Sequence, residues 1–154
     1  MIRRARVSDI ERLDHILFQV QDVHANGRPD IFIKGAKKYN DEQLTAIIND
    51  DQRPIFVYTD DNDMVLGYAF CIYEYVENNS MHKMKTLYID DLCVDENYRR
   101  RHIATDLYHY VLQEASNNDC YRVTLNVWCL NGSAMKFYEK MGMNKLKIVM
   151  EQIV

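Results

Sequence analysis

The sequence predicts a single α/β domain over residues 1–154, with a mixed and mostly antiparallel sheet. Its length and composition, 47% apolar and 27% charged residues, suit one globular core. Two helical patterns near the N-terminus precede three β-rich segments joined by short polar turns, which is typical of an antiparallel meander. A strand, a helix and another strand then follow in order, and this order favours a parallel, right-handed βαβ unit.

The first third of the chain is expected to form a strand and two helices. Residues 1–7 alternate weakly as an opening strand, and Ser8-Asp9 can cap the helix that follows. Apolar residues recur at helical spacing until Gly27 ends the pattern. Residues 41–51 form the second helix, capped by Asn40 or Asp41. His15 and His24, on or beside the first helix, are interpreted as ordinary surface or boundary residues.

The segment 27–39 joins the two helices without a clear period. It mixes Pro, Gly, apolar residues and lysines. A loop of this length in a compact domain is often a functional lid. The alternative is a packed connector with a solvated lysine face.

The meander is expected from strands at 54–59, 64–76 and 84–94, followed by a helix over 103–116. Polar turns separate the strands, and the first of these turns is the sequence Asp-Asp-Asn-Asp.

The chain then continues with a strand over 121–128 and a helix that Asn131-Gly132-Ser133 caps, that runs through Lys140 and that Gly142 ends. A last strand over 145–154 follows.

Composition argues against several classes of protein. No apolar run approaches the roughly 18 residues of a membrane helix, and the N-terminus lacks a signal-peptide core, so a cytoplasmic protein is expected. The net charge of −4 argues against a general nucleic-acid binder. The five histidines show no metal-ligand spacing, so no metal site is expected. Four cysteines lack any C-x-x-C spacing and are expected to be buried free thiols: Cys71, Cys93, Cys120 and Cys129.

The stretch 88–108 carries the clearest chemical signal. An apolar strand runs through the arginine-rich turn 99–101 into a helix. Unpaired N–H groups and the helix dipole favour an anion at such a position, and the arginines would suit a phosphate-bearing cofactor. A solvated basic turn, or a surface for nucleic acid or an acidic partner, remains the alternative.

A second motif follows the next strand: Asn131-x-x-Ala134-x-x-Phe137-Tyr138-Glu139-Lys140-x-Gly142. With this motif, nearly the whole chain resembles the GCN5-related N-acetyltransferase (GNAT) superfamily. The resemblance implies the GNAT acyl-CoA N-acyltransferase fold, acetyl-CoA as co-substrate, no metal and a homodimer.

The resemblance assigns the pyrophosphate of acetyl-CoA to the turn and the helix start. The family motif (Arg/Gln)-x-x-Gly-x-(Gly/Ala) aligns with a run in which His102 stands at the usual first glycine. The residues so assigned are Arg99, Arg100, Arg101, His102, Ile103, Ala104 and Thr105.

The resemblance also assigns the pantetheine arm. The backbone of Leu92, Cys93 and Val94 would bind the arm and the acetyl carbonyl at a splay between the parallel strands. Asn131 would contact the arm as well, and Ala134 and Phe137 would pack beside it.

Three residues are candidates for catalysis. By resemblance Tyr138 protonates the departing thiolate, and a phenol is a suitable donor. The amine must lose its proton before it can attack, which calls for a carboxylate nearby. Asp90 and Asp91 are the candidates, in a segment, YIDDLCV, that resembles the spermidine/spermine branch of the superfamily. Successive strand residues face opposite sides, so only one should face the acceptor unless a bulge intervenes. Alignment with that branch favours Asp90.

The predicted function is therefore transfer of acetyl from acetyl-CoA to a primary amine, with a small cationic amine or amino compound as acceptor. The alternatives are a catalytically weak acyl-CoA sensor, or an acetyltransferase for protein N-termini or lysines. The sequence leaves open the acceptor's identity.

Overall fold

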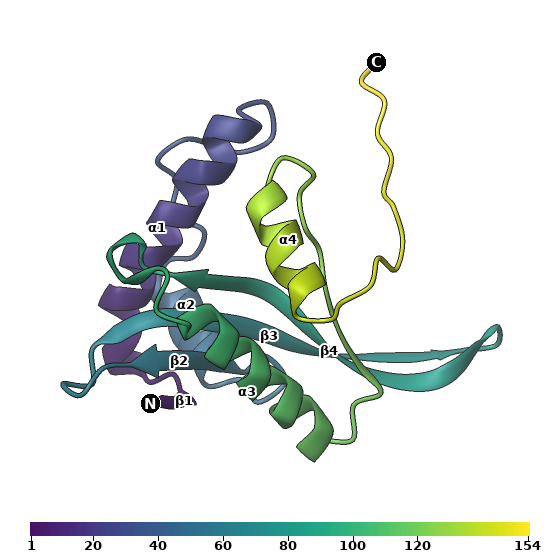
Figure 1. Cartoon of the computed structure of the whole chain (residues 1–154), viewed down its shortest axis with the longest axis horizontal. Helices are drawn as coiled ribbons and strands as arrows, with labels where there is room; N and C mark the ends of the chain where they lie inside the picture. The colour runs from purple at the N-terminus through teal and green to yellow at the C-terminus, as the bar shows by residue number, and fades with distance from the viewer.

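The computed structural model describes all 154 residues and has a five-stranded sheet in the order β1-β2-β3-β4-β5 (Figure 1). The first four strands are antiparallel, and β5 runs parallel to β4, as the strand-helix-strand order predicts. The strands are β1 Ile2–Arg4, β2 Ile55–Thr59, β3 Val65–Asn78, β4 Met81–Val94 and β5 Arg122–Leu125.

Four helices accompany the sheet: α1 Ile10–Gly27, α2 Asp41–Ile48, α3 Ile103–Asn117 and α4 Gly132–Lys140. Short 3-10 turns lie at Val7–Asp9 and Glu96–Tyr98. Figure 1 shows the β3–β4 hairpin extending beyond the rest of the sheet, and both α1 and α4 extend above the sheet in this view. No helix has the length and apolar character needed to cross a membrane.

The core is divided between the two faces of the sheet. Because strand side chains alternate, neighbours such as Ile55 and Phe56 in β2 face opposite layers. Ile55 belongs to the layer under α1 and α2, which includes Leu13, Ile16 and Leu44. Phe56 belongs to the layer under α3, which includes Leu107, Val111, Leu87 and Ile89.

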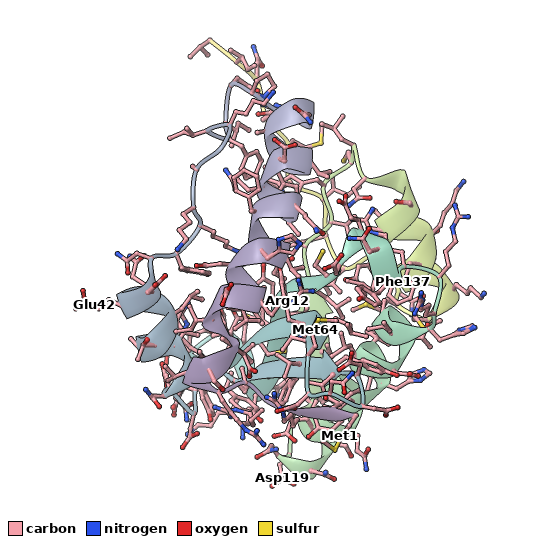
Figure 2. The ribbon with its side chains drawn as sticks, turned by 90° about the vertical axis from the view of Figure 1, so that its left-hand side faces the viewer. Met1, Arg12, Glu42, Met64, Asp119 and Phe137 are labelled. Carbon is pink, nitrogen blue, oxygen red and sulfur yellow. The ribbon has the colours of Figure 1, made fainter.

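Arg12 ties α1 to the end of β4. Its guanidinium donates to the Asp95 carboxylate at 2.6 Å and to the backbone carbonyl of Val65 at 3.0 Å. Figure 2 shows Arg12 over the sheet, whereas Glu42 on α2 lies at the outside. Burial works against the charged form of Asp95, but the N–H of Asn97 and the Arg12 guanidinium outweigh it and lower the pKa of Asp95.

The predicted elements are present with shifted ends, except for the last strand. The prediction of a strand over 145–154 is wrong for this chain, because no segment of the sheet pairs with it. After α4 the chain rises away from the sheet (Figure 1). The predicted strand over 121–128 keeps only its first residues, Arg122–Leu125, since its pairing with β4 ends at Leu125.

The cysteines are all free thiols, as predicted. Their predicted burial holds for Cys71, whereas Cys93 and Cys120 are half-buried. Cys129 is exposed, because it lies in the connection between β5 and α4 rather than in a strand.

Candidate active site

A β-bulge in β4 brings two acidic side chains to one face of the sheet. Phe70 of β3 pairs with Asp91, but the next residue, Cys71, pairs with Ile89, so Asp90 is the extra residue. Asp90 contacts the loop before α2, and Asp91 contacts Tyr68, which faces α1. Both carboxylates therefore lie on the α1 side of the sheet.

Asp91 is the more enclosed of the two carboxylates. The Tyr68 hydroxyl donates to its Oδ2 at 2.9 Å, and Tyr68 itself is fully buried. Burial raises the pKa of Asp91, and the nearby Lys38 ammonium opposes that effect without cancelling it. A carboxylate with a raised pKa is a better proton acceptor than an ordinary surface aspartate.

Asp90 is held by the segment between α1 and α2. Lys38 Nζ lies 3.2 Å from its Oδ2, and the Tyr39 hydroxyl donates to the same oxygen at 3.4 Å. Tyr39 stacks on Phe70 with ring centroids 6.0 Å apart. The predicted lid therefore reaches the candidate site through its last two residues. Lys38 is exposed, as the alternative of a solvated lysine face expects, but it also pairs with Asp90.

Tyr138 lies on α4 in an aromatic cluster. Its ring centroid is 6.1 Å from that of Tyr108 on α3 and 5.1 Å from that of Phe137. Burial raises the pKa of Tyr138, and the charges of Asp91 and Cys93 add to the rise. The hydroxyl thus keeps its proton at neutral pH. Tyr138 packs in the layer under α3, yet the Asp91 charge is close enough to influence it.

Cys93 is unsuited to act as a thiolate nucleophile. Burial, with the Asp91 charge as the next cause, raises the pKa of Cys93 to about 12. A thiol with such a pKa is almost entirely protonated at neutral pH. Its contribution to a site is therefore through its backbone.

The backbone of β4 is open on one side beyond Ile89. Pairing with β5 stops at Ile89 and Leu125, whereas pairing with β3 continues to Val94. The backbone groups of residues 90–94 that point away from β3 therefore have no strand partner. Such an edge can bind an extended amide-bearing chain by added strand-like hydrogen bonds.

Gly67 fits closely against this segment. A Cβ at Gly67 would lie 2.9 Å from the Cys93 carbonyl oxygen and 3.2 Å from a methyl of Ile103. The absence of a side chain therefore lets β3, the end of β4 and the start of α3 approach one another. Sequence analysis did not identify Gly67, although an isolated glycine within a strand pattern signals a close backbone approach.

The turn before α3 has an unusual backbone. Arg100 and His102 have φ of 63° and 61°, in the left-handed region that favours glycine. His102 is the N-cap residue of α3, so its conformation explains why a glycine suits this position. Arg99, Arg100 and Arg101 are exposed, and Arg101 lies over the Tyr98 ring at 5.1 Å.

Exposed arginines, a left-handed turn and the free N–H groups of a 15-residue helix together fit a phosphate-bearing ligand. Ile103 is buried beneath the turn, while Ala104 and Thr105 are half-buried in the first turn of α3.

Asn131 has a structural role that the sequence also indicated. Its Oδ1 accepts from the backbone N–H of Ala134 at 3.1 Å and from the Ser133 hydroxyl at 3.0 Å, which caps α4. Phe137, one turn later, packs against the core layer under α3. The cap and this contact fix the orientation from which Tyr138 projects.

A cavity of about 140 Å³ lies between the end of α1, the following loop and the β5–α4 connection. Its walls include His24, Arg28, Phe32, Trp128 and Asn131. The His24 and Phe32 rings are 4.9 Å apart, and those of Phe32 and Trp128 are 5.3 Å apart.

His24 is half-buried, which agrees with the prediction of a surface or boundary residue. Burial lowers its pKa, and the charges of Asp91 and Lys38 are the next largest influences. Of the two carboxylates, Asp91 is thus close enough to influence one wall of the cavity. No group of three or more His, Cys, Asp or Glu side chains is arranged to hold a metal ion.

Solved structures of other proteins share this fold. The BH1408 protein of Bacillus halodurans, in a mutant form, superposes with a TM-score of 0.95 at 27% identity, over 100% of this chain and 99% of that one. An aminoglycoside N-acetyltransferase in complex with CoA shares the fold, with a TM-score of 0.72 at 16% identity over 100% and 98% of the two chains.

Streptothricin acetyltransferase A of Bacillus subtilis is 28% identical over 122 residues. The match spans 71% of this chain and 66% of that relative, just under two thirds of its length. Residues 20–143 match the model of the Acetyltransferase (GNAT) family. Because that match covers most of the chain, the protein belongs to the GNAT acetyltransferase family.

Proposed function

We propose that the protein transfers the acetyl group of acetyl-CoA to a primary amine by direct attack in a ternary complex. The observation that carries the proposal is the β4 bulge, which turns Asp90 and Asp91 toward one face where β4 separates from β5. Two relatives, named for streptothricin and for aminoglycosides, support a small cationic amine or amino compound as the acceptor.

Asp91 accepts the proton of the acceptor ammonium, directly or through water, and Asp90 draws the cation to the site. The neutral amine then attacks the thioester carbonyl, so that a C–N bond forms and the C–S bond breaks, and the nitrogen releases its extra proton to water. Tyr138 gives its proton to the departing thiolate and regains one from solvent. The raised pKa of Asp91 supports its role, since this group holds an accepted proton more strongly than it would in water. Tyr138 is protonated at neutral pH and so has a proton to donate.

Acetyl-CoA supplies the activated acetyl group. The free edge of β4 at Leu92, Cys93 and Val94 suits its amide-bearing arm, with Asn131, Ala134 and Phe137 beside it. The turn and the start of α3 suit its phosphates, through the residues Arg99, Arg100, Arg101, His102, Ile103, Ala104 and Thr105.

An acceptor screen tests the proposal. Calorimetry with acetyl-CoA measures binding, and release of free thiol in the presence of diamines, aminoglycosides, amino acids and lysine peptides measures transfer. Turnover with a small cationic amine is the expected result. Binding without turnover for any acceptor would favour a sensor, turnover only with peptides would favour a protein acetyltransferase, and absence of binding would refute the proposal.

We further infer that two copies associate through the segment 144–154, here called the tail. Its apolar side chains are 64–84% exposed, or fully exposed at the terminus, which is unusual for a monomer. Glu151 pairs with Arg28 at 2.5 Å, but the tail joins no strand. The apolar residues are Leu146, Ile148, Val149, Met150, Ile153 and Val154.

The outer edge of β5 has no strand partner, so it can pair with the tail of a second copy. Analytical ultracentrifugation of the full chain should show a dimer, and a chain ending at Asn144 should be monomeric. A monomeric full chain would refute this association.

A further inference from the structure

The segment between α1 and α2 carries three lysines with different surroundings. Lys37 joins the two helices, with Nζ 2.5 Å from Asp14 and 2.9 Å from Asp41. Lys34 is exposed and makes no ion pair. Lys38 alone reaches the sheet, where it pairs with Asp90.

The pair between Lys38 and Asp90 is partly shielded from solvent. The side chains are 36% and 27% exposed. Burial opposes the charge of Lys38, but Asp91 and then Asp90 outweigh it and raise the pKa of Lys38. The ammonium therefore stays charged and interacts with both carboxylates that the proposed reaction uses.

The position of Lys38 matters because a cationic acceptor needs the same carboxylates. Asp90 Oδ2 already accepts from Lys38 and from Tyr39. An acceptor ammonium that pairs with this same oxygen must replace the Lys38 ammonium. Such an exchange trades one ion pair for another, so the net electrostatic gain is small.

The residues around Lys38 connect this exchange to the rest of the segment. Tyr39, its neighbour, stacks on Phe70 of the sheet. Farther back in the segment, Phe32 packs edge-on against Trp128. Trp128 is the only tryptophan in the chain, so its fluorescence reports on this segment.

We propose that Lys38 is a specificity-determining residue that occupies the acceptor's cation subsite and competes with monocationic amines for it. The subsite then favours acceptors with two or more positive charges, because these can replace Lys38 at Asp90 and still retain a charge for Asp91. The expected effect on KM rests on the proposed function. The competition between Lys38 and an added amine for Asp90 does not, because it can be measured without acetyl-CoA.

The first experiment measures acrylamide quenching of Trp128 fluorescence at constant ionic strength. Lys38→Met keeps a long side chain but removes the charge, Lys38→Arg keeps the charge, and Lys34→Met is the matched control. We expect about twofold stronger quenching in Lys38→Met alone. Adding 1,4-diaminobutane should raise the quenching of the wild type toward that level, while n-butylamine should have a smaller effect.

The second experiment measures the apparent KM for n-butylamine and 1,4-diaminobutane with saturating acetyl-CoA. A partly exposed ion pair contributes about 1 kcal/mol, which corresponds to roughly a fivefold change. The KM for n-butylamine should fall about fivefold in Lys38→Met, and the KM for the diamine should fall less. Lys38→Arg should resemble the wild type.

The outcomes separate the two proposals. Equal quenching in Lys38→Met, Lys34→Met and the wild type would overturn the competition, and so would an unchanged or raised KM for n-butylamine in Lys38→Met. If no variant acetylates any amine, the proposed function fails, and the quenching measurements still decide whether Lys38 competes with an added cation.

Discussion

The two halves of the candidate site are built in different ways. Most of the half assigned to acetyl-CoA is one continuous strand, turn and helix, which offers unpaired backbone groups of β4 and the start of α3. The half assigned to the acceptor consists of side chains from separate segments, such as Lys38, Tyr68 and Asp91. The half assigned to acetyl-CoA therefore depends on one stretch of sequence, whereas single substitutions in separate segments can alter the half assigned to the acceptor.

The largest effect is expected where the two halves meet, at Tyr138. Tyr138→Phe keeps the ring packed against Tyr108 but removes the proton donor. Turnover should fall about 1,000-fold, within the usual range for a general acid, while the affinity for acetyl-CoA changes less than twofold. Steady-state rates and calorimetry check this. Unchanged turnover would remove Tyr138 from the mechanism.

A smaller loss is expected in the acceptor half, from Asp91→Asn. Turnover should fall about 100-fold, less than for Tyr138 because Asp90 can accept the proton in part. In the wild type, the apparent pKa of the acid limb in the pH profile of kcat/KM should lie above the pKa of an ordinary carboxylate, since burial raises the pKa of Asp91. Loss of that limb in Asp91→Asn, measured from pH 4 to pH 8, checks the assignment.

The same substitution should stabilise the fold. A raised folded pKa means that the folded state binds the proton more tightly than the unfolded state does. The stability from this group is complete below the ordinary pKa of 3.8 and is lost as pH rises through the folded value. At pH 7, Asp91→Asn should therefore raise the free energy of unfolding by about 1 kcal/mol, as measured by urea denaturation. A less stable variant would contradict this.

Gly67→Ala tests the backbone geometry of the cofactor half. The added methyl would lie 2.9 Å from the Cys93 carbonyl, so β4 must shift. We expect a loss of about 1–3 kcal/mol in stability and roughly tenfold weaker binding of acetyl-CoA. Gly132→Ala, where an added Cβ meets nothing within 4 Å, is the control. Normal cofactor affinity in Gly67→Ala would show that this contact does not position the site.

The smallest effect is expected at His102. A β-branched residue is strongly disfavoured at a φ of 61°, whereas glycine adopts it freely. His102→Val should weaken acetyl-CoA binding about five- to tenfold, corresponding to about 1–1.4 kcal/mol of strain. His102→Gly should bind as tightly as the wild type or more tightly. Weaker binding by the glycine variant would show that the imidazole itself contributes.

The local geometry of the half assigned to acetyl-CoA is easier to predict from the sequence than the contacts of the half assigned to the acceptor, for a physical reason. The turn at 99–102 and the cap at Asn131 depend on neighbours within a few residues, so the sequence shows them directly. Lys38 and Asp90 are 52 positions apart, and Tyr68 and Asp91 are 23 apart, so only the folded sheet brings these pairs together.

The bulge and the unpaired tail also depend on contacts that the local sequence does not show. Alternation along β4 predicts opposite faces for Asp90 and Asp91, and only the observed register with β3 shows that they share one. The tail has the composition of a strand, but a strand also needs a neighbour with a free edge in the right place. The sequence does not show whether that neighbour belongs to the same chain.

The β4 bulge also has a consequence for how the chain finds its register. In a regular ladder, one of the two adjacent aspartates would point into the layer under α3, among Leu87, Ile89 and Leu107. A carboxylate without partners there would cost several kcal/mol. A β3–β4 hairpin that forms without the bulge would therefore be less stable than the bulged one. The two adjacent aspartates thus favour the observed register between β3 and β4.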